Sequence, residues 1–157
     1  MEKCGKDFKV GSCEGQRVVD GETMPLVLEP PESNESDIES LLSALRKNKD
    51  WFEEMIVKNS AVLLRGFGVK SAEDFNEIVE TFGWDDIRYV GPAPRTHIYK
   101  RVWTANEGPL SEFIYYHHEM VLVSQVLRAF FFLFFYFLWK NCLLVLYVFM
   151  IYVMNDD

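Results

Sequence analysis

Three stripes of apolar residues in the first half of the chain recur at three- and four-residue steps. This spacing puts the apolar side chains of a segment on one side of an α-helix. The stripes are formed by Ile38, Leu41, Leu42 and Leu45, by Phe52, Met55 and Ile56, and by Phe75, Ile78, Val79 and Phe82. We therefore predict three amphipathic helices and interpret their stripes as surfaces that face the core.

Short polar signals set the expected ends of these helices. The run from Ser36 to Glu39 fits a capping box at the start of the first helix, and Asp50 with Glu53 offers a second one. The second helix should end near Asn59. The third should open at 71–74, where acidic residues suit the helix dipole, and stop at Gly83.

Four other segments have the composition of strands. Residues 24–28 predict an edge strand, because an edge tolerates Pro25, and residues 61–64 are a short apolar run typical of a buried strand. Residues 96–104 and 113–121 are rich in β-branched and aromatic side chains. Helices that precede strands in this way indicate the α+β class.

Composition and charge exclude some classes of function for this chain. The 157 residues carry 24 acidic and 16 basic side chains, a formal charge of −8, which argues against a broad nucleic-acid surface. Three widely spaced cysteines suggest reduced thiols in an intracellular setting, and the first residues lack the apolar run of a signal peptide. The apolar content is uneven, since 7 of the 13 Phe lie in residues 129–157.

The C-terminal residues 126–157 form an apolar tail. From Ala129 to Met154 the tail is almost entirely apolar over 26 residues, interrupted at Lys140, and a bilayer crossing needs about 20. The run predicts an apolar C-terminal helix with membrane contact through 129–154. A competing hypothesis is translated intron, because Gln125 and Val126 can be encoded by the sequence of an exon–intron boundary, followed by residues that T-rich codons supply.

Candidate chemistry lies at His117, His118 and Glu119. On a strand, His117 and Glu119 project from one face and His118 from the other. One imidazole and one carboxylate on a common face are two of the three groups in a 2-His-1-carboxylate triad, which binds non-heme Fe(II). A His-x-Glu triplet by itself is a weak signal, and a satisfied structural histidine is its commoner explanation.

Several ordered motifs resemble the plant clavaminate synthase-like proteins of the TauD/TfdA family. Between residues 61 and 120 the matching stretches are 61–67, 71–76, 82–83, 89–91, 93–96, 102–107 and 117–120, and 18–21 and 25–28 are similar to the family's N-terminal segment. The resemblance implies a cytoplasmic Fe(II)- and 2-oxoglutarate-dependent dioxygenase, an oxidoreductase acting with O₂ on a small molecule of unknown identity. The implied fold is the N-terminal part of a double-stranded β-helix, a cupin-like jelly roll with flanking helices.

By match to the family motif, His117 and Glu119 are the expected iron ligands. Arg65 is interpreted as structural, as a buried ion-pair partner. Thr104, Asn106 and Glu107 are expected beside the pocket. The family's distal His and the Arg that follows it have no counterpart, because no His follows Glu119 and only Arg128 and Lys140 are basic there.

Residues 1–125 are therefore expected to be a partial, truncated oxygenase domain that is weak or inactive alone. The alternative is a small membrane-anchored or partner-binding protein without catalysis.

Overall fold

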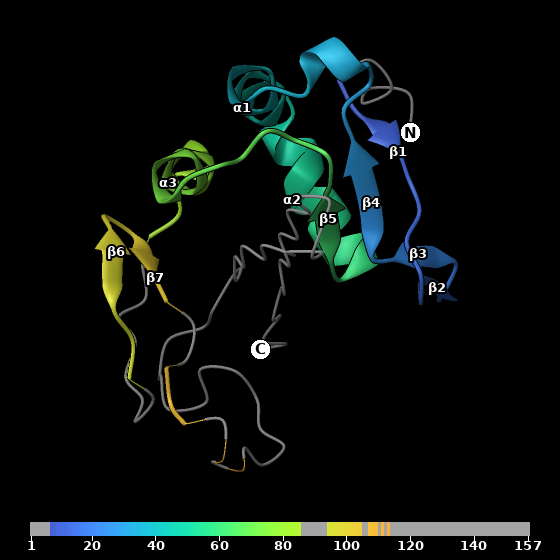
Figure 1. Cartoon of the computed structure of the whole chain (residues 1–157). Coiled ribbons are helices and arrows are strands. Elements are labelled where there is room, and N and C mark those ends of the chain that lie inside the picture. Colours follow the sequence, from blue (N-terminus) through green and yellow to red (C-terminus); the bar gives the residue numbers. More distant parts are fainter. Residues whose placement is uncertain (1–6, 86–93, 105–106, 110, 112, 114–157) are drawn as a thin grey trace, which may run out of the picture.

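The computed structural model describes residues 7–85, 94–104, 107–109, 111 and 113, and these form a mixed α+β structure (Figure 1). The α+β class predicted from the sequence is confirmed. In chain order the elements are β1 (Lys9–Val10), β2 (Arg17–Val19), β3 (Glu22–Met24), β4 (Leu26–Glu29), a 3₁₀ helix (Ser33–Glu35), α1 (Ile38–Lys47), α2 (Lys49–Asn59), β5 (Val62–Leu64), α3 (Ala72–Phe82), β6 (His97–Tyr99) and β7 (Val102–Trp103).

The largest described sheet has the strand order β1-β4-β5, with β1 antiparallel and β5 parallel to β4. The strand predicted within residues 24–28 is present, but its predicted edge position is wrong, since β4 begins at Leu26 and is the central strand of this sheet. Pro25 precedes the strand, so its missing N–H removes no hydrogen bond from the ladder. All of β5 is buried, as its continuous apolar run predicted.

Strands β2 and β3 form a separate antiparallel hairpin in which Val19 pairs with Glu22. The two turn residues, Asp20 and Gly21, have φ angles of 51° and 90°. Positive φ at both positions is what a tight hairpin turn requires, and an Asp-Gly pair supplies it with little steric cost.

The caps of the first two helices differ from the predicted ones, by one residue in α1 and by two residues in α2, whose N-cap is Asn48. Asp37, not Ser36, caps α1, because its Oδ1 accepts the backbone N–H of Ser40 at 2.9 Å. Helix α2 already begins at Lys49, so Asp50 lies in its first turn and the predicted box with Glu53 is not its cap. The predicted positions of both caps are wrong because several neighbouring residues have side chains that can cap a helix, and only the backbone geometry selects one of them.

Helix α3 matches its prediction closely. The Ser71 hydroxyl accepts the Asp74 N–H at 3.1 Å, and the Asp74 carboxylate accepts the Ser71 N–H at 3.2 Å, which completes a capping box. Gly83 ends the helix with a φ of 63°. The predicted end of α2 at Asn59 is also confirmed.

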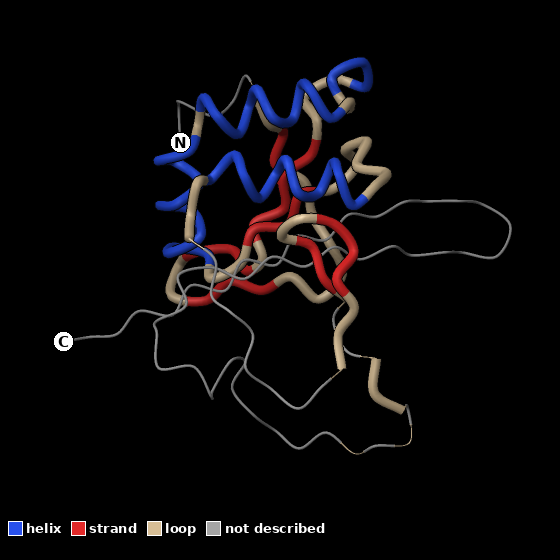
Figure 2. Tube along the Cα trace, turned by 90° about the vertical axis from the view of Figure 1, so that its left-hand side faces the viewer, coloured by secondary structure: helices blue, strands red, loops and turns tan. Residues whose placement is uncertain are grey.

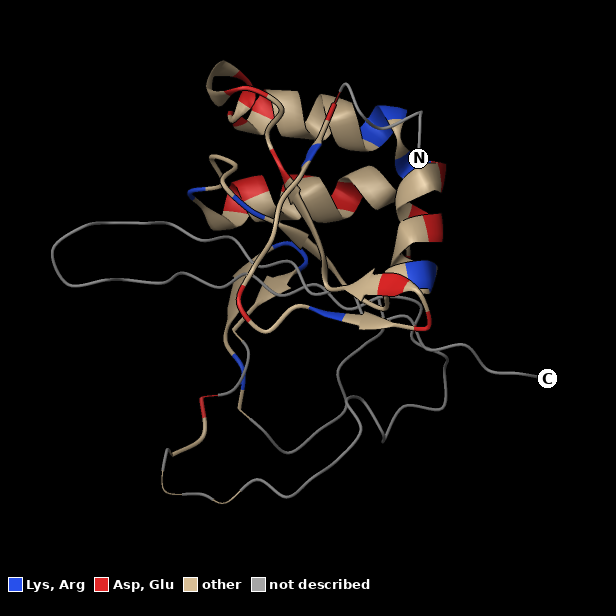
Figure 3. Cartoon of the chain, turned by 90° about the vertical axis from the view of Figure 1, so that its right-hand side faces the viewer, with Lys and Arg blue, Asp and Glu red and all other residues tan. Residues whose placement is uncertain are grey.

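The helices lie beside the strands (Figure 2), and their apolar stripes form one buried cluster with residues of β4 and β5. Phe52 is fully buried at its centre, with ring centroids 5.3 Å from Phe8 and 6.1 Å from Phe82. Leu41, Leu45 and Ile78 are likewise buried, which confirms that the stripes face the core. Acidic residues recur on the exposed faces of all three helices (Figure 3).

The predicted single strand at 96–104 is wrong. The segment folds into a hairpin, in which His97 of β6 pairs with Trp103 of β7 and the chain reverses at Lys100 and Arg101. Both strands are β-branched and aromatic in composition, and Lys100 and Arg101 are not typical turn residues. The sequence pattern therefore gives no sign of the turn and predicts one continuous strand.

The described strands do not themselves make a jelly roll, and that part of the fold expectation stays a prediction. Of the strand expected at 113–121, only Phe113 is described, and it lies outside any strand. The tail 126–157 and its expected apolar helix lie outside the described residues. Within the part of the chain that is described, no helix is long and apolar enough to span a bilayer.

Candidate functional site

The expected iron ligands His117 and Glu119, together with His118 and Asn106, lie outside the described residues. Their predicted juxtaposition therefore stays a prediction. Among the residues that the structure does describe, no group of three or more His, Cys, Asp or Glu side chains is arranged to hold a metal ion. Of the residues expected beside the pocket, Thr104 and Glu107 are described, and both follow the hairpin β6–β7.

The open end of the hairpin is closed by hydrogen bonds around Thr96. Its backbone N–H donates to Thr104 Oγ1 at 2.7 Å, and the Thr104 N–H donates to the Thr96 carbonyl at 2.9 Å. The Thr96 hydroxyl donates to Glu107 Oε2 at 2.6 Å, and the Glu107 N–H donates to the Pro94 carbonyl at 3.0 Å. Two residues expected beside the pocket, Thr104 and Glu107, thus have structural partners that fix the hairpin's base.

The turn of the hairpin is held against α3 by Arg101. Its backbone N–H donates to Oδ1 of Asn76, a side chain only 1% exposed, at 3.1 Å. Its guanidinium donates to the Trp84 carbonyl at 2.5 Å and lies 3.6 Å from the Glu80 carboxylate. Sequence reasoning missed this anchor, although a polar residue directly beside the apolar stripe of α3 was a signal for Asn76.

His97 and Trp103 lie side by side on the hairpin, with ring centroids 4.8 Å apart. Trp103 is 57% exposed, and the Nε2 of His97 lies 2.8 Å from the Lys100 carbonyl. His97 is thus engaged in its own hairpin turn. We predict no part for it in the expected metal site, because it lies upstream on a different predicted strand from His117.

Arg65 pairs with Glu29, as the interpretation of a structural ion pair predicted. The Arg65 Nε lies 3.0 Å from Glu29 Oε1, and Nη2 contacts the same oxygen. The two side chains are 31% and 25% exposed, so the pair is half-buried. It joins the end of β4 to the residue that follows β5, beside the parallel ladder.

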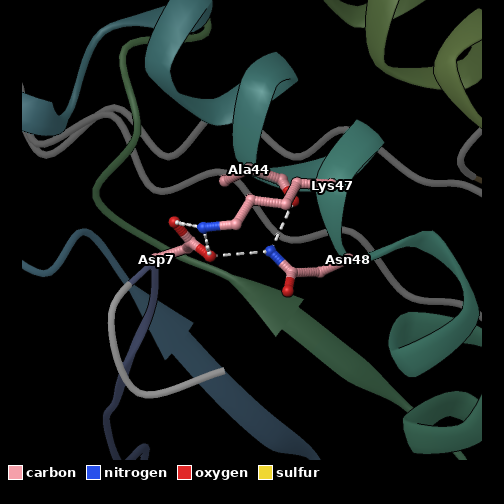
Figure 4. Close-up of polar contacts among 4 residues, drawn as sticks. All are labelled: Asp7, Ala44, Lys47 and Asn48. Carbon is pink, nitrogen blue, oxygen red and sulfur yellow. Dashed lines mark hydrogen bonds and ion pairs between the residues drawn. The ribbon is translucent and has the colours of Figure 1, made fainter. Parts of the chain in front are cut away.

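A second polar cluster ties the N-terminal segment to the junction of α1 and α2 (Figure 4). The Asp7 carboxylate accepts from Lys47 Nζ at 2.8 and 2.9 Å and from Asn48 Nδ2 at 3.0 Å. The same Asn48 amide donates to the Ala44 carbonyl at 2.8 Å. These contacts fix the segment that places Phe8 in the core, and they account for the polar Asn48 buried at this junction.

A cavity of about 410 Å³ opens beside this cluster. It is lined by Asp7, Pro31, Glu35, Glu39, Ser40, Ser43, Ala44 and Phe67. Its carboxylates are separate from the described hairpin and from the sequence positions of the expected ligands. None of its lining residues is among those that the sequence predicts for the iron site.

The groups whose pKa values are shifted lie at a helix end or in a surface ion pair. The hydroxyl and backbone N–H of Ser40 lower the pKa of Asp37, the cap of α1. Hydrogen bonding and charge attraction between Glu54 and Lys58 lower the pKa of the carboxyl and raise that of the ammonium. These three groups lie on the surface and the causes of their shifts are structural, so the shifts do not indicate an acid–base catalyst.

Comparison with known proteins gives a relative for most of the chain, while no family model matches it. The chain is similar to the Clavaminate synthase-like protein At3g21360 of Arabidopsis thaliana, with 37% identity over 122 residues. The aligned region covers 74% of this chain and 37% of the relative, so the chain spans little more than a third of the relative's length. This match supports the clavaminate synthase-like family name that the sequence motifs indicated.

Proposed function

We propose that this chain is a partial oxygenase related to the Fe(II)- and 2-oxoglutarate-dependent dioxygenases of the TauD/TfdA family. The observation that carries the proposal is the 37% identity to a clavaminate synthase-like protein over 122 residues. Identity over that length is far more specific than the His-x-Glu triplet alone. The small-molecule substrate is not identified by this similarity.

In this proposal His117 and Glu119 bind Fe(II), and His118 does not. The donor set suits the metal, because a neutral imidazole and a carboxylate are two of the three ligands of a facial triad. When bound in a full triad, iron supplies open positions for 2-oxoglutarate and O₂. This chain carries no His after His118, so its donor set does not complete the triad. We therefore expect weak Fe(II) binding and little or no oxygenase turnover by the chain alone.

Two residues expected beside the pocket, Thr104 and Glu107, belong to the hydrogen-bonded base of the described hairpin. The hydrogen bonds of Thr96 with Thr104 and Glu107 fix the base of the hairpin, and the contacts of Arg101 fix its turn on α3.

Anaerobic Fe(II) titration of the full chain tests the proposal. We expect His117→Ala and Glu119→Ala each to abolish binding, because each removes one of the only two ligands. His118→Ala is the matched control and should bind iron like the parent chain. Equal binding by all three variants, or binding lost only in His118→Ala, would overturn the assignment.

A second candidate is a membrane-anchored or partner-binding protein without catalysis, and the 26-residue apolar run 129–154 favours it. Flotation of the full chain with phospholipid vesicles, together with Fe(II) titration, separates the candidates. Vesicle binding by a chain that is indifferent to iron supports the second candidate, and iron binding without vesicle binding supports the first. Transcript sequencing tests the intron hypothesis, which requires a message from which the apolar stretch is spliced out.

A further inference from the structure

No further inference is drawn: the strongest candidate, the exposed apolar side chains of the β6–β7 hairpin, Ile98 and Trp103, with Phe113 in the segment after it, carries nothing because nothing in the described part of the structure shows what covers them.

Discussion

Asp37 shows how one side chain couples the stability of α1 to pH. Its Oδ2 accepts the Ser40 hydroxyl at 2.7 Å and its Oδ1 accepts the Ser40 N–H, and these bonds lower its pKa. A carboxyl with a lowered pKa in the folded state stabilises the fold above its unfolded pKa. That contribution is lost as the pH falls through the folded pKa.

The variant Asp37→Asn tests this coupling, because Asn also caps helices but does not titrate. We expect the parent chain to lose more stability than Asp37→Asn between neutral pH and the acidic range where Asp37 protonates. Urea unfolding of both proteins across that pH range measures the difference. Parallel pH profiles for the two would contradict the assignment.

The Arg65–Glu29 pair gives a second prediction for single residues. Because both side chains are about a quarter to a third exposed, water screens their attraction only partly. A double-mutant cycle with Arg65→Ala and Glu29→Ala should give a coupling of about 1 kcal/mol, at the upper end for ion pairs reached by solvent. The more exposed pair Glu54–Lys58 is the control and should couple less strongly. An equal or smaller coupling for Arg65–Glu29 would reject the structural role.

Among the elements, the attachment of the β6–β7 hairpin to α3 depends on Asn76. The variant Asn76→Leu removes the acceptor of the Arg101 N–H and leaves that part-buried donor without its partner. A buried donor without its acceptor costs about 1–3 kcal/mol. Denaturant unfolding should show a loss of this size, and amide exchange should rise in residues 96–104. The exposed Glu73→Ala on the same helix is the control, and a similar result for it would show a general effect on α3.

The sequence predicts the described helices better than the described strands, for a physical reason. A helix shows its 3.6-residue periodicity within its own segment of sequence. The stripes through Leu41, Phe52 and Ile78 therefore identify α1, α2 and α3. The reversal at Lys100 depends instead on a contact between Arg101 and Asn76, 25 residues apart in sequence. Similarly, the central place of β4 depends on its pairing with β1 and β5, which no local pattern contains.

For the candidate site, the sequence identifies the expected ligands, and the described structure shows the hydrogen bonds and ion pairs of other residues that the sequence singled out. His117 and Glu119 follow from strand alternation and family resemblance, and their placement stays a prediction. Arg65 was interpreted as a structural ion-pair partner, and the structure confirms it through Glu29. The roles of Thr104 and Glu107 could not be assigned beforehand, because their hydrogen bonds with Thr96 form only after the hairpin closes.

At the scale of the whole molecule, the aromatic core joins elements from both ends of the described N-terminal part. Phe52 of α2 contacts Phe8 before β1 and Phe82 at the end of α3, with both ring pairs at edge-to-face angles of 72–74°. Through these rings the N-terminal segment, α2 and α3 share one core. A substitution that removes the Phe52 ring should therefore destabilise all three elements together.

The variant Phe52→Ala tests this cooperativity. It removes a fully buried ring and leaves a cavity, which costs about 3–5 kcal/mol, a large part of the 5–15 kcal/mol that stabilises an ordinary domain. Phe113→Ala makes the same chemical change at a side chain that is 77% exposed and should cost far less. Unfolding followed by tryptophan fluorescence and by far-ultraviolet circular dichroism should give coincident transitions for the parent chain, shifted together to lower denaturant in Phe52→Ala. If one probe shifted without the other, α2 and α3 would unfold independently and the single shared core would be refuted.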